Sequence, residues 1–190
     1  ELIYMRTIYS YQMIATLFVN HQSNIIGFQP DENGNQVLDN VAENDVEGIE
    51  LEFIWQLSGD IRLNSSATHL WKNDTKLGEL TGLPKSENIS PDSLFKLNLN
   101  YKVDRWSVNF NANWRSQVDV LNDGNLWLFN GNVQKQLTGG STLSFSVTNL
   151  FDKAYKTSAH SSLGEDLTGN EVRYFPARGR QVMLSYTYSF

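Results

Sequence analysis

Hydrophobic and polar residues alternate along much of the chain. Between residues 106 and 114, tryptophan, valine, phenylalanine and alanine take every second position, and serine or asparagine fills the positions between them. Residues 95–103 repeat the pattern, with lysine and asparagine at the polar positions. A period of two is typical of a β-strand, because successive side chains point to opposite faces. No segment combines a 3.6-residue apolar stripe with capping residues, so we expect almost no helix.

Clusters of Gly, Pro, Asn and Asp divide this pattern into about nine strands. The expected strands are residues 2–8, 12–26, 37–57, 61–73, 92–103, 106–120, 125–137, 142–151 and 180–190. Tight turns near residues 9–10, 58–60, 103–105 and 138–140 alternate with longer loops. The longer loops are residues 27–36, 74–91, 121–124 and 152–179. Because alternate connections of an up-and-down sheet lie at opposite ends, the long loops should all lie at one end.

This segregation of loop lengths predicts an all-β protein, an antiparallel up-and-down transmembrane β-barrel with short periplasmic turns and long extracellular loops. The polar faces favour Asn, Ser, Thr and Gln, which suit a wet lumen, and aromatic residues near the ends of the apolar faces are typical of a membrane boundary. The expected boundary residues are Trp55, Tyr101, Trp106, Phe145, Tyr188 and Phe190 toward the short turns, and Trp71 and Trp114 toward the long loops. A soluble β-sandwich that binds a carbohydrate or another ligand remains the alternative, since it also explains the alternation.

Composition excludes several other classes. The 190 residues include 15 Lys plus Arg and 21 Asp plus Glu, and the basic residues are scattered, which argues against a nucleic-acid surface. The chain has no cysteine, so a disulfide scaffold and a thiolate metal site are both excluded. The longest nearly apolar run, residues 13–19, is far shorter than a membrane helix requires.

Two C-terminal motifs carry a family resemblance. The run from Val147 to Tyr155, followed by Pro176 to Arg180 and a last strand that ends in Phe190, resembles the end of TonB-dependent outer-membrane receptors. The matching residues are Asn149, Leu150, Phe151, Asp152, Tyr155, Pro176, Arg178, Gly179 and Arg180. Residues 44–52 are similar to a second recurrent stretch of the same barrels.

The resemblance implies a 22-stranded barrel, filled by an N-terminal plug, in the outer membrane of a Gram-negative bacterium. Residues 1–190 would be the C-terminal portion of that barrel, without plug or TonB box, and about nine strands cannot close alone because such barrels have even strand numbers. The implied function is active transport of a scarce nutrient, with a ferric siderophore as the favoured ligand, coupled to TonB. The iron chelate would be cargo, so we expect no cofactor and no catalytic residue. The implied partners are membrane lipid, lipopolysaccharide, the plug, TonB through the plug and the barrel-assembly machinery.

Candidate site residues fall into two groups. Tyr155, His160, Arg173 and Tyr174 lie in the expected loop 152–179 and are candidate ligand contacts, because long loops on rigid scaffolds often bind ligands; the alternative is an ordinary mobile loop. Tyr186, Tyr188 and Phe190 resemble the terminal strand signal of barrel assembly, although a terminal aromatic residue can also be a plain boundary residue.

Other polar residues have simpler interpretations. Glu50 and Glu52 share one strand face, and we expect them to meet arginines of a plug or of a neighbouring strand rather than to catalyse glycoside hydrolysis. The three histidines are too far apart in sequence for a recognisable metal motif, so no metal site is expected. Arg178 and Arg180 are expected to hold the last strand against lumen carboxylates or lipopolysaccharide.

Overall fold

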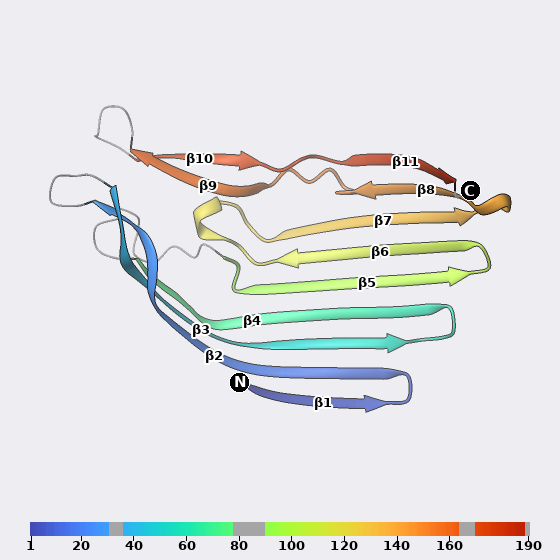
Figure 1. Ribbon diagram of the computed structural model, residues 1–190, viewed down its shortest axis with the longest axis horizontal. Helices are drawn as coiled ribbons and strands as arrows, with labels where there is room; N and C mark the ends of the chain where they lie inside the picture. Colours follow the sequence, from blue (N-terminus) through green and yellow to red (C-terminus); the bar gives the residue numbers. More distant parts are fainter. Residues whose placement is uncertain (31–35, 78–89, 164–169, 189–190) are drawn as a thin grey trace.

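The structure is a computed structural model that describes residues 1–30, 36–77, 90–163 and 170–188 (Figure 1). The main sheet contains nine antiparallel strands in the order β1-β2-β3-β4-β5-β6-β7-β8-β11. Their bounds are β1 Leu2–Ile8, β2 Tyr11–Pro30, β3 Gln36–Gln56, β4 Ile61–Leu77, β5 Ser93–Val103, β6 Trp106–Arg115, β7 Leu126–Gln136, β8 Ser141–Thr148 and β11 Gln181–Tyr188. A separate hairpin consists of β9 Lys156–Leu163 and β10 Asn170–Pro176.

The sheet is an up-and-down meander with two open edges. Each strand from β1 to β8 pairs with the next strand in sequence, and β8 then pairs with β11 across the hairpin. Strands β1 and β11 form the edges, so the nine strands do not close into a barrel. The predicted fold class and topology are confirmed, as is the expectation that this chain alone leaves the barrel open.

The strand register places apolar residues opposite apolar residues and amide residues opposite amide residues on neighbouring strands. Phe95 pairs with Trp114 and Leu99 with Phe110, whereas the intervening Asn98 pairs with Asn111. Residues directly opposite each other in an antiparallel pair share a face. One face of the sheet is therefore continuously apolar, and the other is rich in amides and hydroxyls.

The apolar face is exposed rather than buried in a core. Leu184 is 69% exposed and Phe145 46% exposed, although both are large hydrophobic residues. Within the described residues, the buried hydrophobic side chains are Ala112, Val118, Leu121 and Leu126. A β-sandwich would cover this face with a second sheet, whereas the other sheet among the described residues, the β9–β10 hairpin, leaves these side chains exposed. The sandwich alternative is therefore wrong, and the exposed face fits lipid instead.

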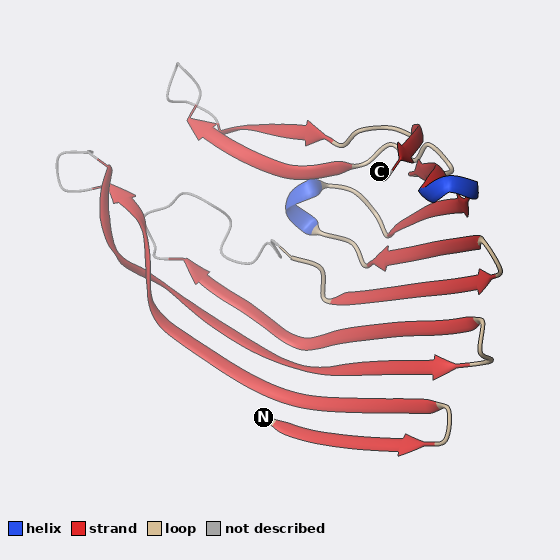
Figure 2. Cartoon of the chain, turned by 45° about the vertical axis from the view of Figure 1, so that its right-hand side comes forward, coloured by secondary structure: helices blue, strands red, loops and turns tan. Residues whose placement is uncertain are grey.

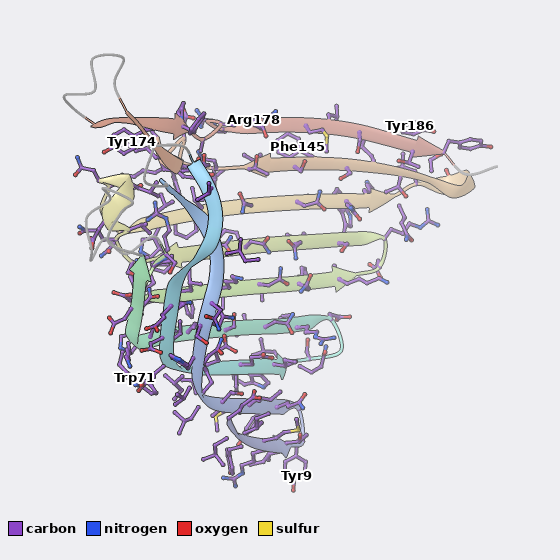
Figure 3. The ribbon with its side chains drawn as sticks, turned by 60° about the vertical axis from the view of Figure 1, so that its left-hand side comes forward. Tyr9, Trp71, Phe145, Tyr174, Arg178 and Tyr186 are labelled. Atoms are coloured by element: carbon purple, nitrogen blue, oxygen red, sulfur yellow. The ribbon has the colours of Figure 1, made fainter. Side chains whose placement is uncertain are left out.

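The two ends of the sheet differ as predicted. Figures 1 and 2 show the tight turns at one end, which we call the short-turn end, and the long excursions at the other, the long-loop end. Figure 3 shows Trp71 toward the long-loop end, and Tyr9 and Tyr186 at the short-turn end. Phe145 lies near the middle of β8 rather than at its end, so its predicted boundary position is wrong.

Two strands extend further than the sequence pattern indicated. Strand β2 continues to Pro30, into the expected loop 27–36, and β4 continues to Leu77, into the expected loop 74–91. Strand β3, at Gln36–Gln56, matches the expected 37–57 to within one residue at each end. The distal parts of β2, β3 and β4 pair with one another, which satisfies backbone groups without requiring an apolar face. Residues 78–89 of the second loop lie outside the described residues.

The expected loop 152–179 is wrong in two parts, because β9 occupies Lys156–Leu163 and β10 occupies Asn170–Pro176. Strand β9 reads Lys-Thr-Ser-Ala-His-Ser-Ser-Leu, which lacks apolar alternation, so no strand was expected there. The expected strand 106–120 ends at Arg115 and is followed by a 3-10 turn, η1, at Asp119–Leu121; a second turn, η2, spans Thr138–Gly140. No helix in the described part of the chain is long and apolar enough to cross a membrane.

A close approach between β2, β3 and β4 occurs at Gly48. The β3–β4 register shifts between Glu47 and Gly48. A Cβ atom on Gly48 would lie 2.8 Å from the His69 carbonyl oxygen, 2.8 Å from Phe18 and 2.7 Å from Leu70. Only a residue without a side chain fits this position, because the backbone oxygen cannot move without disturbing β4.

We predict that Gly48→Ala destabilises the full-length receptor by about 1–3 kcal/mol, because overpacking displaces neighbouring groups. The midpoint of its heat-induced mobility shift in detergent should fall. Gly59→Ala is the matched control, since no atom lies within 4 Å of a Cβ added there. Equal midpoints for wild type and Gly48→Ala would contradict the packing argument.

Candidate functional site at the long-loop end

The two C-terminal motifs meet in space through Asn149. Its Oδ1 accepts a hydrogen bond from the Lys153 backbone N–H at 2.8 Å, and its Nδ2 donates to the Lys153 carbonyl at 2.9 Å and to the Arg178 carbonyl at 3.5 Å. Asn149 is only 7% exposed and has a φ of 51°, a left-handed conformation that asparagine tolerates better than most residues. One side chain thus joins the end of β8 to the segment before β11.

Asp152 makes the second link between the motifs. Its backbone N–H donates to the Asn149 carbonyl at 2.9 Å, and its Oδ1 accepts from the Arg180 backbone N–H at 2.7 Å. A Cβ on Gly179 would lie 2.8 Å from that same Oδ1, which explains why glycine precedes Arg180. We call Asn149, Asp152, Arg178, Gly179 and Arg180 the C-terminal clamp.

The clamp closes the base of the β9–β10 hairpin. The Ala177 N–H donates to the Tyr155 carbonyl at 2.9 Å, directly before β9 begins. Leu150 N–H donates to the Phe129 carbonyl at 2.8 Å, which extends the bonding between β7 and β8 past the strand end. The hairpin therefore leaves the sheet between two strands that stay paired.

The four candidate ligand contacts all belong to this hairpin or its base. Tyr155 is half-buried at the base, and Tyr174 on β10 is 37% exposed. The backbone register places Arg173 directly opposite His160; their side chains lie outside what the structure describes. The structure thus gathers residues that lie up to 19 positions apart in sequence, from Tyr155 to Tyr174.

Lys156 anchors the hairpin and was not singled out from the sequence. Its Nζ donates to the Leu121 carbonyl at 2.7 Å and to the Asn122 carbonyl at 3.4 Å, and lies 3.6 Å from the centre of the Tyr174 ring. The carbonyls belong to the end of η1, where a cation is favoured. A lysine next to a motif gives no signal of this role, because its partners lie 34 and 35 residues earlier.

The turn that receives Lys156 is itself fixed by an ion pair. Arg115 Nη2 and Asp123 Oδ2 lie 2.6 Å apart, and both side chains are less than one-fifth exposed. Val118 and Leu121 are buried beneath the turn. This gives the hairpin a firm attachment site at the long-loop end.

A charged cluster lies on the distal parts of β2, β3 and β4, beyond the apolar band. Lys72 Nζ is 3.3 Å from Asp45 Oδ2 and 3.5 Å from Glu47 Oε1, and Trp71 Nε1 donates to Glu47 at 3.0 Å. The hydrogen bond from His21, and then Lys72, lowers the pKa of Asp45, while Asp45 raises the pKa of Lys72. The two carboxylates thus share one lysine. Among the described residues, no group of three or more His, Asp or Glu is arranged to hold a metal ion.

The polar face carries neutral amides and two unpaired carboxylates. Asn109 Nδ2 donates to Asn100 Oδ1 at 2.7 Å, and Asn111 Nδ2 donates to Asn109 Oδ1 at 3.2 Å. Glu50 and Glu52 are exposed, and no cation contacts them within the described residues.

Within the described residues neither glutamate pairs with an arginine of a neighbouring strand, so the expectation that they meet arginines of a plug stays a prediction. Arg62 on β4 instead donates from Nε to Asn64 Oδ1 at 3.1 Å. The carboxylates of Glu50 and Glu52 are left facing the lumen side of the sheet.

Tyr186 and Tyr188, two residues of the terminal strand signal, lie on β11, an edge strand. The Tyr186 hydroxyl is 2.8 Å from Ser141 Oγ, and its ring is exposed on the apolar face. Tyr188 is also exposed, and Phe190 lies outside the described residues. The assembly role of these residues stays a prediction.

Comparison with known proteins identifies the family. The family model described as TonB dependent receptor-like, beta-barrel matches residues 10–150, and the chain belongs to this family. Members of this barrel family are outer-membrane proteins of Gram-negative bacteria, which assigns the same location to this chain. No curated protein sequence matches the chain.

Solved structures share the fold. The ferric yersiniabactin uptake receptor FyuA from Yersinia pestis aligns with a TM-score of 0.73 and 17% identity over 96% of this chain and 28% of its own. The copper transporter OprC aligns with a TM-score of 0.67 and 24% identity, over 98% of this chain and 30% of its own. The ferric-catecholate import receptor Fiu from E. coli K12 aligns with a TM-score of 0.66 and 20% identity, over 93% of this chain and 25% of its own. The chain thus spans 30% or less of the length of these three receptors.

We predict that Asn149→Asp weakens the clamp, because a carboxylate cannot donate to the Lys153 and Arg178 carbonyls. The loss of stability should be about 2 kcal/mol, measured as a lower midpoint of the heat-induced mobility shift of the full-length receptor. Asn113→Asp is the control, since Asn113 lies on the polar face without a described side-chain bond. If both variants shift the midpoint equally, the clamp has no special role.

Proposed function

We propose that this chain is the C-terminal part of the barrel of a TonB-coupled receptor that imports a ferric siderophore. The observation that carries the proposal is the match of residues 10–150 to the receptor barrel family, on a sheet whose apolar face is turned outward. Several solved relatives are named as receptors for ferric siderophores, among them FyuA and Fiu. That shared ligand chemistry supports an iron chelate as the cargo.

In the proposed receptor, the missing strands and the plug are supplied by parts of the protein outside this chain. The open edges at β1 and β11 require neighbours, because unpaired backbone groups are costly in lipid. The amide-rich face would surround the plug. Glu50 and Glu52, which lack a cation among the described residues, are suited to basic side chains of that plug. TonB would act through the plug rather than on this chain.

The long-loop end is proposed to face the exterior, where it meets the ligand. Long loops face outward in barrels of this type, and the short turns face the periplasm. The β9–β10 hairpin would then present Tyr174, with Lys156 fixing its position against η1. Binding would be noncovalent, and the iron chelate would be cargo rather than a cofactor, so no catalytic step is assigned to these residues.

Assembly of the receptor is proposed to begin at the last strand. Strand β11 is an apolar edge strand with Tyr186 and Tyr188 exposed, a form suited to docking by strand pairing with the barrel-assembly machinery. Phe190 would complete this signal.

We predict that cells expressing the full-length receptor accumulate a defined ferric siderophore under iron limitation, and that uptake is lost when TonB is deleted. In the same receptor, Lys156→Met should raise the Kd for the chelate roughly tenfold, because the hairpin loses a charged anchor and a cation–π contact. Radiolabelled-iron uptake and equilibrium binding to whole cells measure the two effects.

Lys102→Met is the matched control, because Lys102 is exposed near the short-turn end and far from the hairpin. Uptake that continues without TonB would indicate a passive pore and contradict the proposal. An unchanged Kd for Lys156→Met would leave transport intact but remove the hairpin from the ligand site.

A further inference from the structure

Four asparagines on the polar face of β5 and β6 form one hydrogen-bonded chain. Asn111 Nδ2 donates to Asn109 Oδ1 at 3.2 Å, and Asn109 Nδ2 donates to Asn100 Oδ1 at 2.7 Å. Asn100 Nδ2 in turn donates to Asn98 Oδ1, which also accepts a 3.4 Å bond from Asn109. All these donors point toward Asn98, so the chain is polarised and ends in the NH2 group of Asn98, which has no acceptor within the described residues.

The strand register places this end of the chain beside a second amide and between two cations. Asn98 of β5 pairs with Asn64 of β4. Arg62 precedes Asn64 by two residues and Lys96 precedes Asn98 by two residues, so both share the polar face with the amide pair. Because β4 and β5 are antiparallel, the two cations lie on opposite sides of the pair, each about 7 Å along its strand. We call Arg62, Asn64, Lys96 and Asn98 the lumen donor cluster.

The cluster offers donors without matching acceptors. Arg62 uses its Nε on Asn64 Oδ1 at 3.1 Å, and its two terminal nitrogens have no acceptor in the described part of the chain. Lys96 is exposed and its side chain makes no contact with another described residue. The oxygens of Asn64 and Asn98 are already bonded, whereas their NH2 groups are available. Since arginine and lysine side chains can only donate, the ligand that fits here must supply acceptors.

The neighbouring strands bring no acid to the cluster. On the polar face of β3, Glu52 lies opposite Ser66, and Ser66 of β4 separates it from Lys96. Arg115, further along the polar face of β6, differs because it pairs with Asp123 at 2.6 Å. The lumen donor cluster is therefore a place where positive charge and amide donors face the lumen together without a described counter-ion.

We propose that the lumen donor cluster binds the anionic oxygens of the iron chelate on its way through the barrel, and hence that the cargo is a negatively charged chelate. A guanidinium donates paired hydrogen bonds to anionic oxygens, and bonds of this kind are stronger than those between neutral groups. Lys96 adds charge on the other side of the amide pair, and the NH2 group of Asn98 donates from the polarised end of its chain.

The position of the cluster separates it from the hairpin at the long-loop end. Arg62 is the second residue of β4, next to the short-turn end. A chelate that enters at the long-loop end would therefore reach the cluster after it has left the β9–β10 hairpin. The inference rests on the proposed function, because it takes a ferric chelate as the cargo, and it adds the sign of the cargo's charge and a second site for it.

The test uses the purified full-length receptor and two simple ferric chelates that differ in charge. Ferric tris-catecholate is an anion, whereas ferric tris-acetohydroxamate is neutral. Equilibrium dialysis with radiolabelled iron measures the Kd of each. The double variant Arg62→Gln/Lys96→Gln should raise the Kd for the tris-catecholate at least about tenfold, because two charged donors are lost, and should leave the Kd for the neutral chelate unchanged.

Lys135→Gln is the matched control. It removes an exposed cation near the same end of the sheet but on the apolar face, where Lys135 Nζ lies 4.6 Å from the centre of the Trp106 ring. Both of its Kd values should equal those of wild type. Lys96→Gln alone repeats the test if the double variant fails to assemble, since the Lys96 side chain has no described contact to lose.

Three results would each overturn the proposal. An unchanged Kd for the tris-catecholate in the double variant would show that the cluster is not an open site for the cargo, as would be the case if a plug acid filled it. An equal rise for both chelates would indicate a loss of structure rather than of charge recognition, and an equal rise in Lys135→Gln would indicate a general charge effect. Because the purified receptor is tested without TonB, failure of the transport proposal would show separately, as absent or TonB-independent uptake by cells.

Discussion

The pairing of backbone hydrogen-bonding groups within lipid is the constraint on which this structure depends. A strand that crosses a bilayer has no water to satisfy its N–H and C=O groups, so each strand needs a neighbour on both sides. The nine-stranded sheet meets this requirement everywhere except at β1 and β11. Its apolar face needs no covering layer because lipid supplies one, which is why so few hydrophobic side chains among the described residues are buried. Our proposal that the chain is one part of a larger barrel wall explains both the open edges and the exposed face.

The same constraint gives the C-terminal clamp its importance. Strands β8 and β11 must stay paired although the β9–β10 hairpin separates them in sequence, and Asn149 and Asp152 bond the two ends where the strands meet. These bonds use backbone groups and short polar side chains, so they leave the longer side chains of Lys153, Arg178 and Arg180 exposed. One motif can thus keep β8 and β11 in register and fix the base of the β9–β10 hairpin.

The sequence pattern was sufficient to predict the strands of the main sheet, but it did not predict the β9–β10 hairpin. Alternation in β5 and β6 predicted both faces because each face has a uniform environment, lipid on one side and a polar lumen on the other. Strand β9 carries no such alternation, and its pairing with β10 depends on contacts that composition does not reveal. The motif residues Asn149 and Asp152 were found through family resemblance, but Lys156 was not, because its role depends on η1, more than 30 residues away. The position of η1, rather than the identity of Lys156, therefore determines where the hairpin is anchored.

The most direct test of the account is a label scan of β5 and β6 in the membrane. The described chain contains no cysteine, so single cysteines at residues 95–103 and 106–115, in an otherwise cysteine-free full-length receptor, can each carry a spin label. The account predicts that accessibility to oxygen, which concentrates in lipid, is high at Leu97, Leu99 and Phe110 and low at Asn98, Asn100 and Asn109. A scan without a period of two, or one in which the asparagine positions face lipid, would contradict the assignment of the two faces.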